Sequence, residues 1–394
     1  MELLIKNAQV IDWSQNFIGD IYIKNGIISE IGVNLDKNCK VLDAKNLIVM
    51  PAFVDLHVHF RDPGFTYKED VESGSRAAVK GGFTLVNLMA NTKPVCSNMD
   101  VVNYVKEKAK KIGLIDVHQT VSITKNFNGV DIDHLDLLDN TVKVISEDGK
   151  DVMDGKIMFE AMKKAKEKNM IVMCHCEEHN FSKEDMRLAE NLMTLRNLQL
   201  AKFTGCKIHI AHVSTKEAME YIIRAKKEGV NATCEVAPHH LVINDEIKYR
   251  VNPPLRKDTD IKFLIKAVED GYVDVIATDH APHSDEDKKN GAPGISGIEV
   301  AFPLCYTTLV KDGKLTLNQL SKIMSKNPSD ILGIKKGAIK IGYDGDLVLI
   351  DLEKKFEINK EKFASKGKNT PFNGKEVYGE IVKTIKGGKV VYSK

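Results

Sequence analysis

Eight apolar runs of strand length recur between residues 48 and 278 at intervals of about thirty residues, and stretches with helical periodicity separate most of them. The runs are almost continuously hydrophobic, which is typical of a parallel sheet with helices on its faces. Eight repeats indicate that the sheet closes into a (β/α)8 TIM barrel. An open doubly wound sheet is the alternative, although no glycine-rich dinucleotide-binding motif follows any of the runs. The expected strands are 48–59, 83–89, 115–123, 141–146, 170–176, 207–213, 231–237 and 273–278, and the expected helices are 99–111, 151–168, 182–203, 215–228 and 259–269.

The two ends of the chain have a different pattern from its middle. Both contain short β-type runs separated by turn signals such as Lys24-Asn25-Gly26, without helical periodicity. Neither end has enough strands for a stable sheet of its own. We therefore expect an α/β protein in which both termini, residues 1–50 and 337–394, form a small β-sandwich domain beside a barrel domain at 51–336.

The composition narrows the class of protein. The chain has 394 residues, 43% of them hydrophobic, and a formal net charge of +2, so it can bury a large core and gives no reason to expect nucleic acid or a membrane surface as partner. Seven cysteines, scattered and odd in number, favour reduced thiols over a disulfide framework. No leader pattern and no apolar run of about eighteen residues occurs, so we expect a soluble, cytoplasmic protein.

The most informative polar residues stand at the end of the first barrel strand, in the run 55–61. Side chains alternate faces along a strand, so Asp55, His57 and His59 point the same way, as does Arg61 if the strand continues that far. Two imidazoles two residues apart can bind one divalent ion such as zinc from the same direction. The alternative is a pair of histidines without an ion, because two imidazoles are a weak signal until other ligands are found.

Polar residues also end the other strands, where the reactive groups of such barrels lie. Lys143 stands between two valines with the parity to point into the barrel mouth, where an unpaired ammonium is costly. Reaction with carbon dioxide would turn its amine into a carboxylate able to bridge two cations. The alternative is a neutral lysine, or one paired with Asp279 or Glu147. The remaining strand-end residues are Asn91, Asp148, His175, His212 and Asp279.

Six short motifs occur along nearly the whole chain. They are HVHFRDPG at 57–64, NTKP at 91–94, CHCEE at 174–178, AHVST at 211–215, VNPPLR at 251–256 and ATDHAPH at 277–283. This set resembles the amidohydrolase superfamily and, within it, the dihydroorotase family. The resemblance implies a metal-dependent hydrolase that acts on cyclic amide C–N bonds.

The resemblance also implies two zinc ions per subunit. His57 and His59 match the histidines of the first metal. The family bridges the two metals either with a carboxylated lysine of the fourth strand or with an aspartate, and this chain has a candidate for each in Lys143 and Asp148. We favour carboxylated Lys143, because a lysine inside an apolar strand needs the explanation that a carboxylate supplies. The implied metal ligands are then His57, His59, Lys143, His175, His212 and Asp279.

The implied reaction is the reversible cyclisation of N-carbamoyl-L-aspartate to L-dihydroorotate and water in de novo pyrimidine biosynthesis, with Asp279 as the proton shuttle. The substrate keeps a free carboxylate, to which Arg61 can form a bidentate pair while Asn91 adds a donor. The polar segment 284–291 is either a mobile lid or an ordinary solvated loop. The substrate-binding residues implied by the match are Arg61, Asn91, Asn252, His283, Pro293 and Gly294.

Two other interpretations stay open. A hydantoinase, dihydropyrimidinase or allantoinase would use the same metals on neutral cyclic ureides, where the anion-binding pair of Arg61 and Asn91 has less to do. A catalytically silent barrel would serve as an assembly scaffold, for instance for aspartate transcarbamoylase, which is also a conceivable partner of the active enzyme. A silent relative should lack some of the ligand positions, and this chain lacks none.

Overall fold

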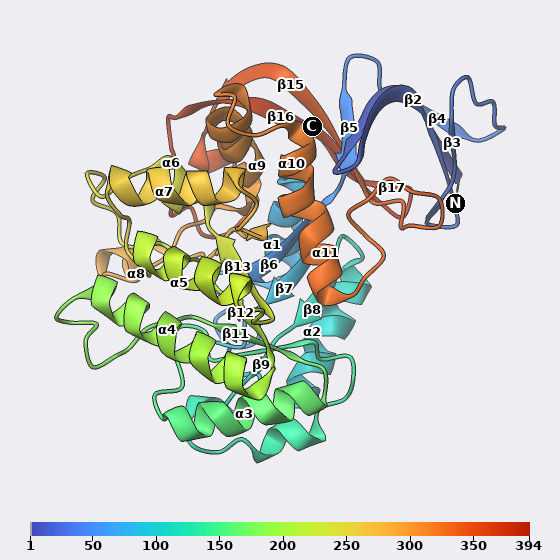
Figure 1. Cartoon of the computed structure of the whole chain (residues 1–394). Coiled ribbons are helices and arrows are strands. Elements are labelled where there is room, and N and C mark those ends of the chain that lie inside the picture. The colour runs from blue at the N-terminus through green and yellow to red at the C-terminus, as the bar shows by residue number, and fades with distance from the viewer. Residues whose placement is uncertain (1) are drawn as a thin grey trace.

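The barrel has eight parallel strands, as the sequence predicts. Residues 2–394 are described by a computed structural model of the chain (Figure 1). Thr120 interrupts the third strand, so that β8 pairs with β7 and β9 pairs with β10. The first and last strands meet at a parallel bridge between Val58 and His280, where the His59 N–H donates to the His280 carbonyl over 2.8 Å. The strands are β6 (Phe53–Val58), β7 (Phe83–Leu88), β8 (Asp116–Gln119), β9 (Val121–Ser122), β10 (Val144–Ser146), β11 (Ile171–Cys174), β12 (Lys207–Ile210), β13 (Ala232–Val236) and β14 (Val275–Ile276).

Helices cover the outside of the barrel, and side-chain caps set where several of them begin (Figure 1). Asp154 and Asp185 accept hydrogen bonds from backbone N–H groups in the first turns of α3 and α4. These helices therefore begin at Gly155 and Met186, later than the apolar pattern predicts. The pattern also does not predict α1, α6 or the helices from α8 onward. The helices are α1 (Val71–Lys80), α2 (Met99–Ile112), α3 (Gly155–Glu167), α4 (Met186–Thr204), α5 (Lys216–Lys227), α6 (Pro238–Val242), α7 (Asp258–Glu269), α8 (Asp285–Lys289), α9 (Ala301–Cys305), α10 (Leu317–Ser321) and α11 (Asn327–Leu332), with π-helical turns at Tyr306–Lys311 and Lys322–Lys326.

The second sheet is built from both ends of the chain. Its strand order is β17-β16-β15-β5-β1-β2-β3, and β4 pairs with the start of β1. Strand β15 pairs antiparallel with β5, from Leu347 opposite Pro51 to Ile350 opposite Ile48, and apolar side chains of both ends share one core. The strands are β1 (Glu2–Asp12), β2 (Gln15–Lys24), β3 (Ile27–Gly32), β4 (Lys40–Asp43), β5 (Ile48–Pro51), β15 (Leu347–Glu357), β16 (Glu376–Lys386) and β17 (Lys389–Ser393). The predicted pairing of the termini is therefore present.

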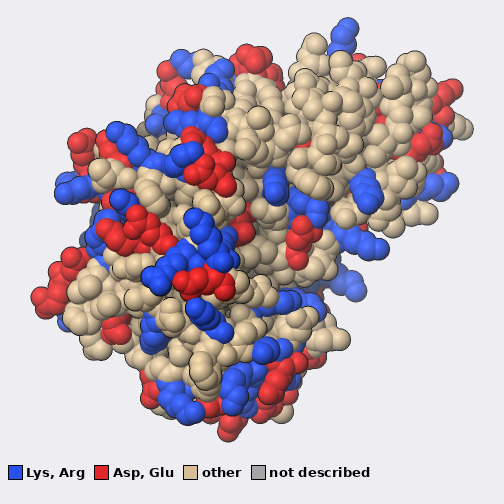
Figure 2. All heavy atoms as spheres, viewed as in Figure 1, with Lys and Arg blue, Asp and Glu red and all other residues tan. Residues whose placement is uncertain are grey.

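The surface reflects the balanced charge of the chain. On the face shown in Figure 2, basic and acidic side chains are interspersed, with apolar and uncharged residues between them. Within residues 2–394, no helix has the length and apolar composition needed to cross a membrane.

Candidate metal centre

The end of strand β6 carries two histidines that face a common polar centre. The rings of His57 and His59 are buried, with centroids 5.3 Å apart. Asp279, just beyond strand β14, places its Oδ1 3.1 Å from His59 Nε2 and 3.7 Å from His57 Nε2. Residues 220 positions apart therefore meet where the barrel closes.

Asp55 belongs to the same polar stripe but does not enter this centre. Its carboxylate accepts hydrogen bonds from the Thr278 N–H (3.0 Å) and hydroxyl (2.5 Å), as well as from the His57 N–H. Because Thr278 follows β14 and Asp55 lies in β6, this carboxylate joins the first and last strands. Burial raises the pKa of Asp55 to about 6, although these hydrogen bonds act in the opposite direction.

Asp148 lies between the histidines. Its Oδ1 is 3.3 Å from both His57 Nε2 and His175 Nδ1, and its Oδ2 is 3.4 Å from His59 Nε2. The centre is completed by His212, whose Nε2 is 2.9 Å from His175 Nδ1. Burial by itself raises the pKa of Asp148, but the neighbouring imidazoles outweigh it and hold that pKa well below its usual range. The carboxylate is therefore ionised and able to act as a ligand.

The donor atoms of this centre fit divalent cations. His57 Nε2 and Asp148 Oδ1 are buried and have no hydrogen-bond partner within residues 2–394, a costly arrangement unless another group binds them. The side chains form two groups of possible ligands, and within each group the ligand atoms lie within 4.8 Å of one another. One group is His57, Asp148 and His212, and the other is His57, His59 and Asp279. Imidazole and carboxylate donors suit zinc and similar ions.

The structure does not bring Lys143, the predicted bridge, into this centre. Lys143 is exposed and precedes β10, three residues before the strand ends at Ser146, or ~10 Å from the end that carries the centre. Its backbone N–H donates to His118 Nε2 over 2.9 Å. The expected strand covers 141–146, whereas β10 begins only at Val144. Asp148, the second candidate, is the carboxylate that lies between the histidines.

Three side chains behind the centre contact the histidine rings, and only one of them, Asn91, is among the site residues predicted from the sequence. His57 Nδ1 is 2.6 Å from Glu235 Oε1, His59 Nδ1 is 2.9 Å from Asn91 Oδ1, and His175 Nε2 is 3.0 Å from Glu177 Oε2. Such partners fix the tautomer and the orientation of metal-binding imidazoles. A signal for Glu235 existed, since it is an acidic residue inside the apolar strand β13. The roles of Glu177 and Glu235 were not predicted.

We expect Glu235→Gln to weaken metal binding by roughly 10- to 100-fold, because the amide keeps the shape of the side chain and loses the charge that polarises His57. Metal content after dialysis against graded chelator concentrations measures the change. The control is Glu246→Gln, at an exposed position. Equal metal retention in both variants would contradict the role assigned to Glu235.

Arg61 is a partly buried cation beside the centre. Its guanidinium is 3.3 Å from His283 Nε2, its Nε has no hydrogen-bond partner, and no carboxylate of residues 2–394 lies within ion-pair distance. Burial lowers the pKa of Arg61, but the group stays protonated in proteins. The Nε of this partly buried charge has no partner, so the site fits an anionic ligand that pairs with it.

The predicted substrate-binding residues line one cavity of about 190 Å³ together with most of the metal-ligand candidates. Asn91 uses its Oδ1 to accept from His59, so its amide nitrogen remains as the donor. Burial, Arg61 and Lys68 lower the pKa of His283 to about 3, which makes its ring neutral at pH 7. The structure brings together Arg61, Asn91, Asn252, His283, Pro293 and Gly294 around this cavity.

The polar segment 284–291 forms the short helix α8 beside the cavity. Ser284 caps the helix, and Asp287 lies 3.2 Å from the Lys68 ammonium. Lys288 donates to the carbonyls of Arg250, Ala292 and Gly294 at 2.8 to 3.1 Å. Lys68 and Lys288 are contacts that the sequence pattern does not predict.

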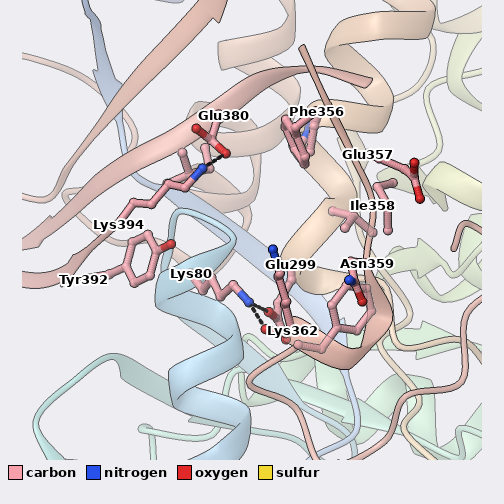
Figure 3. A pocket seen from close by; sticks show the side chains of 14 residues that line it. Lys80, Glu299, Phe356, Glu357, Ile358, Asn359, Lys362, Glu380, Tyr392 and Lys394 are labelled. Carbon is pink, nitrogen blue, oxygen red and sulfur yellow. Dashed lines mark hydrogen bonds and ion pairs between the residues drawn. The ribbon is translucent and has the colours of Figure 1, made fainter. Parts of the chain in front are cut away.

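A second cavity, of about 230 Å³, lies between the barrel and the terminal sheet (Figure 3). Two of its lysines pair with carboxylates that also line it, Lys80 with Glu299 over 2.8 Å and Lys394 with Glu380. None of the histidines lines it, so it is a weaker candidate for chemistry than the metal centre.

Comparison with known proteins agrees with this geometry. The model of the amidohydrolase family matches residues 48–391. The chain belongs to the amidohydrolase family. The match spans every barrel strand and the terminal strands β15 and β16, and so includes all the residues of the metal centre.

Several relatives are similar to this amidohydrolase over their full length. A dihydroorotase of Clostridium botulinum is 56% identical over 398 residues, which cover 100% of both chains. A dihydroorotase of Aquifex aeolicus is 41% identical, with 100% of this chain and 99% of the relative covered. Among solved structures, an L-hydantoinase (dihydropyrimidinase) from Arthrobacter aurescens superposes with a TM-score of 0.92 at 26% identity, covering 100% of this chain and 96% of the other.

Proposed function

We propose that this amidohydrolase is a dihydroorotase, which interconverts N-carbamoyl-L-aspartate and L-dihydroorotate in pyrimidine biosynthesis. The observation that carries the proposal is the partly buried Arg61 guanidinium, which lines the same cavity as the metal ligands and has no carboxylate partner within residues 2–394. Dihydroorotate offers the carboxylate that this cation lacks. The neutral ureides of hydantoinases do not offer it. The full-length similarity to dihydroorotases supports the same choice.

The ligand set fits two zinc ions: His57, His59 and Asp279 would hold one and His175 and His212 the other, and Asp148 lies near both groups of histidines. Two divalent cations, when bound, supply a hydroxide at neutral pH and polarise the substrate carbonyl. The protein contributes the fixed positions of these ligands.

The side chains of the cavity orient the substrate and move its proton. Arg61 pairs with the carboxylate, the Asn91 amide donates to it, and neutral His283 lies against the same end. In hydrolysis a hydroxide adds to the carbonyl carbon, its proton passes to Asp279, and Asp279 delivers that proton to the leaving nitrogen as the ring C–N bond breaks, which leaves a carboxylate. In cyclisation Asp279 accepts the proton of that nitrogen as the C–N bond forms and passes it to the carboxylate oxygen that is lost, which takes one further proton from solvent and leaves as water.

We expect Arg61→Met to raise KM for dihydroorotate by about 10- to 150-fold, equivalent to the roughly 1.5–3 kcal/mol of a charge-assisted hydrogen-bonded pair. Initial rates over a range of substrate concentrations measure it. Hydantoin and dihydrouracil serve as neutral comparison substrates. If the variant keeps the KM of the wild type, Arg61 does not bind the substrate carboxylate.

The direct test is a spectrophotometric assay of dihydroorotate hydrolysis with and without a chelator. The proposal predicts chelator-sensitive turnover of dihydroorotate that exceeds turnover of hydantoin and dihydrouracil. Preference for the neutral rings would favour a hydantoinase, and a metal-free, inactive protein would favour a scaffold. Association with aspartate transcarbamoylase stays a prediction, which co-elution of the two purified proteins would test.

A further inference from the structure

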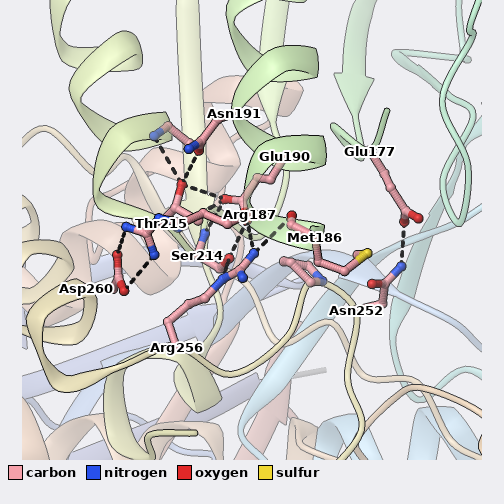
Figure 4. A network of polar contacts seen from close by, with 12 residues as sticks. Glu177, Met186, Arg187, Glu190, Asn191, Ser214, Thr215, Asn252, Arg256 and Asp260 are labelled. Atoms are coloured by element: carbon pink, nitrogen blue, oxygen red, sulfur yellow. Dashed lines mark hydrogen bonds and ion pairs between the residues drawn. The ribbon is translucent and has the colours of Figure 1, made fainter. Parts of the chain in front are cut away.

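The segment 251–256 contacts the loops that follow β11 and β12, the two strands whose ends carry His175 and His212 (Figure 4). At its far end Arg256 forms a buried ion pair with Glu190 over 2.9 Å and donates from Nε to the Ser214 hydroxyl over 2.9 Å. Glu190 also accepts from the Ser214 N–H, two residues after His212. This end of the segment is therefore fixed to the loop that follows β12.

At its near end the segment contacts Glu177, two residues after His175. One oxygen, Glu177 Oε2, is 3.0 Å from His175 Nε2 and accepts from the Asn252 amide over 2.6 Å. The other oxygen accepts from the Ser182 hydroxyl over 2.6 Å. The Glu177 side chain is only 11% exposed, so water competes little for these contacts. Figure 4 shows Glu177 and Asn252 pointing toward each other from different loops.

We propose that Glu177 is a positioning residue that couples recognition of the substrate ring by Asn252 to the orientation of the metal ligand His175. The part of the inference that concerns substrate recognition by Asn252 rests on the proposed function. The part that concerns the orientation of His175 rests only on the geometry of the metal centre. The same oxygen, Glu177 Oε2, contacts both His175 and Asn252, so a shift of this oxygen changes both hydrogen bonds.

The geometry explains how the coupling acts. A hydrogen bond from His175 Nε2 to Glu177 leaves Nδ1 as the ligand atom, and Nδ1 is the nitrogen that lies 3.3 Å from Asp148. The hydrogen bond from Asn252 to Glu177 fixes the amide plane, so its carbonyl oxygen has one direction. Without Glu177 the His175 ring loses its preferred tautomer, and the Asn252 amide loses its anchor.

The first measurement is the affinity for zinc, by competition with a chromophoric chelator on the full-length protein. We expect Glu177→Ala to weaken one of the two sites by about 10- to 100-fold. Glu177→Gln keeps an oxygen that can accept both hydrogen bonds, so it should lose less. The control is Glu178→Gln, the next residue, whose side chain accepts only from Asn180. Wild-type zinc affinity in Glu177→Ala would overturn the proposal, and thermal unfolding of all variants separates this result from misfolding.

The second measurement is a double-mutant cycle for KM with dihydroorotate. Glu177→Ala and Asn252→Ala should each raise KM, and the double variant should raise it no further than the larger single effect. Effects that multiply would show that the two residues act independently and would overturn the coupling. If the wild type does not turn over dihydroorotate, the proposed function fails, whereas the zinc measurement still decides whether Glu177 positions His175.

Discussion

Asp148→Asn should lower dihydroorotate turnover by roughly 100- to 1,000-fold, the range typical of removing one preorganised electrostatic group from a reaction centre. The Asp148 carboxylate lies within 3.4 Å of nitrogens of three histidines, and asparagine keeps its shape while losing its charge. Without that charge the cluster loses the carboxylate that lies between His57 and His59 on one side and His175 on the other. The purified variant should also contain less zinc than the wild type, which elemental analysis measures.

The matched control is Lys143→Ala. Lys143 is exposed and lies before strand β10, so its removal should change turnover by less than about twofold and leave the zinc content unchanged. A carboxylated Lys143 as the bridging group predicts the opposite ranking of the two variants. Comparing them under identical conditions, with bicarbonate present, therefore decides between the two bridging candidates.

Lys336→Met should lower the free energy of unfolding by about 3–5 kcal/mol, the cost of removing one partner from a buried ion pair. The Lys336 ammonium lies 2.9 Å from Asp116 and from Asp344, and 2.5 Å from Asp346. Only Asp346 is buried, and it would keep a negative charge without the lysine. Because Asp116 belongs to β8 and Asp346 precedes β15, the cluster joins the barrel to the terminal sheet.

Urea unfolding at neutral pH measures this effect, with Lys335→Met as the control at the exposed neighbouring position. Burial alone lowers the pKa of Lys336, but the surrounding carboxylates raise it above its usual value. The stabilisation of the folded state by the charged Lys336 is therefore complete at neutral pH and is lost only as the pH rises through the pKa that Lys336 has in the folded state. Equal stability of the Lys335 and Lys336 variants would contradict the cluster's role.

Much of the fold follows from periodicity in the sequence. Each barrel strand lies within one of the predicted apolar runs, because a buried parallel strand must be hydrophobic on both faces. The first run, 48–59, is divided, since Ile48–Pro51 forms β5 of the terminal sheet and only Phe53–Val58 enters the barrel. The histidines 57, 59, 175 and 212, together with Asp279, stand directly at or after strand ends, and parallel strands bring those ends to one rim. Position along the strand was sufficient to find these residues.

The rest depended on where short strands begin and on contacts between distant loops. Strand β10 has three residues, too few for alternation to place Lys143, whereas Asp148 reaches the centre from the loop after it. Glu177 contacts Asn252 on a distant loop, and no local pattern distinguishes it from a surface carboxylate, whereas Glu235 stands out as an acidic residue inside the apolar strand β13 but contacts His57 on a strand far away in the sequence. Among the short helices after α8, α9 and α10 pack against the terminal sheet and α11 packs against barrel strand β6, so their apolar faces depend on tertiary packing.

The place where the barrel becomes a ring has a consequence for assembly. Val58 and His280 form a parallel bridge between its first and last strands, Thr278 donates to Asp55 across the same joint, and the next residues, His59 and Asp279, face each other. A cation held by those two residues would act as a clasp across this joint. The centre can be completed only after residues 220 positions apart have met, so an incompletely closed chain would hold no ion there and stay inert until the ring is finished.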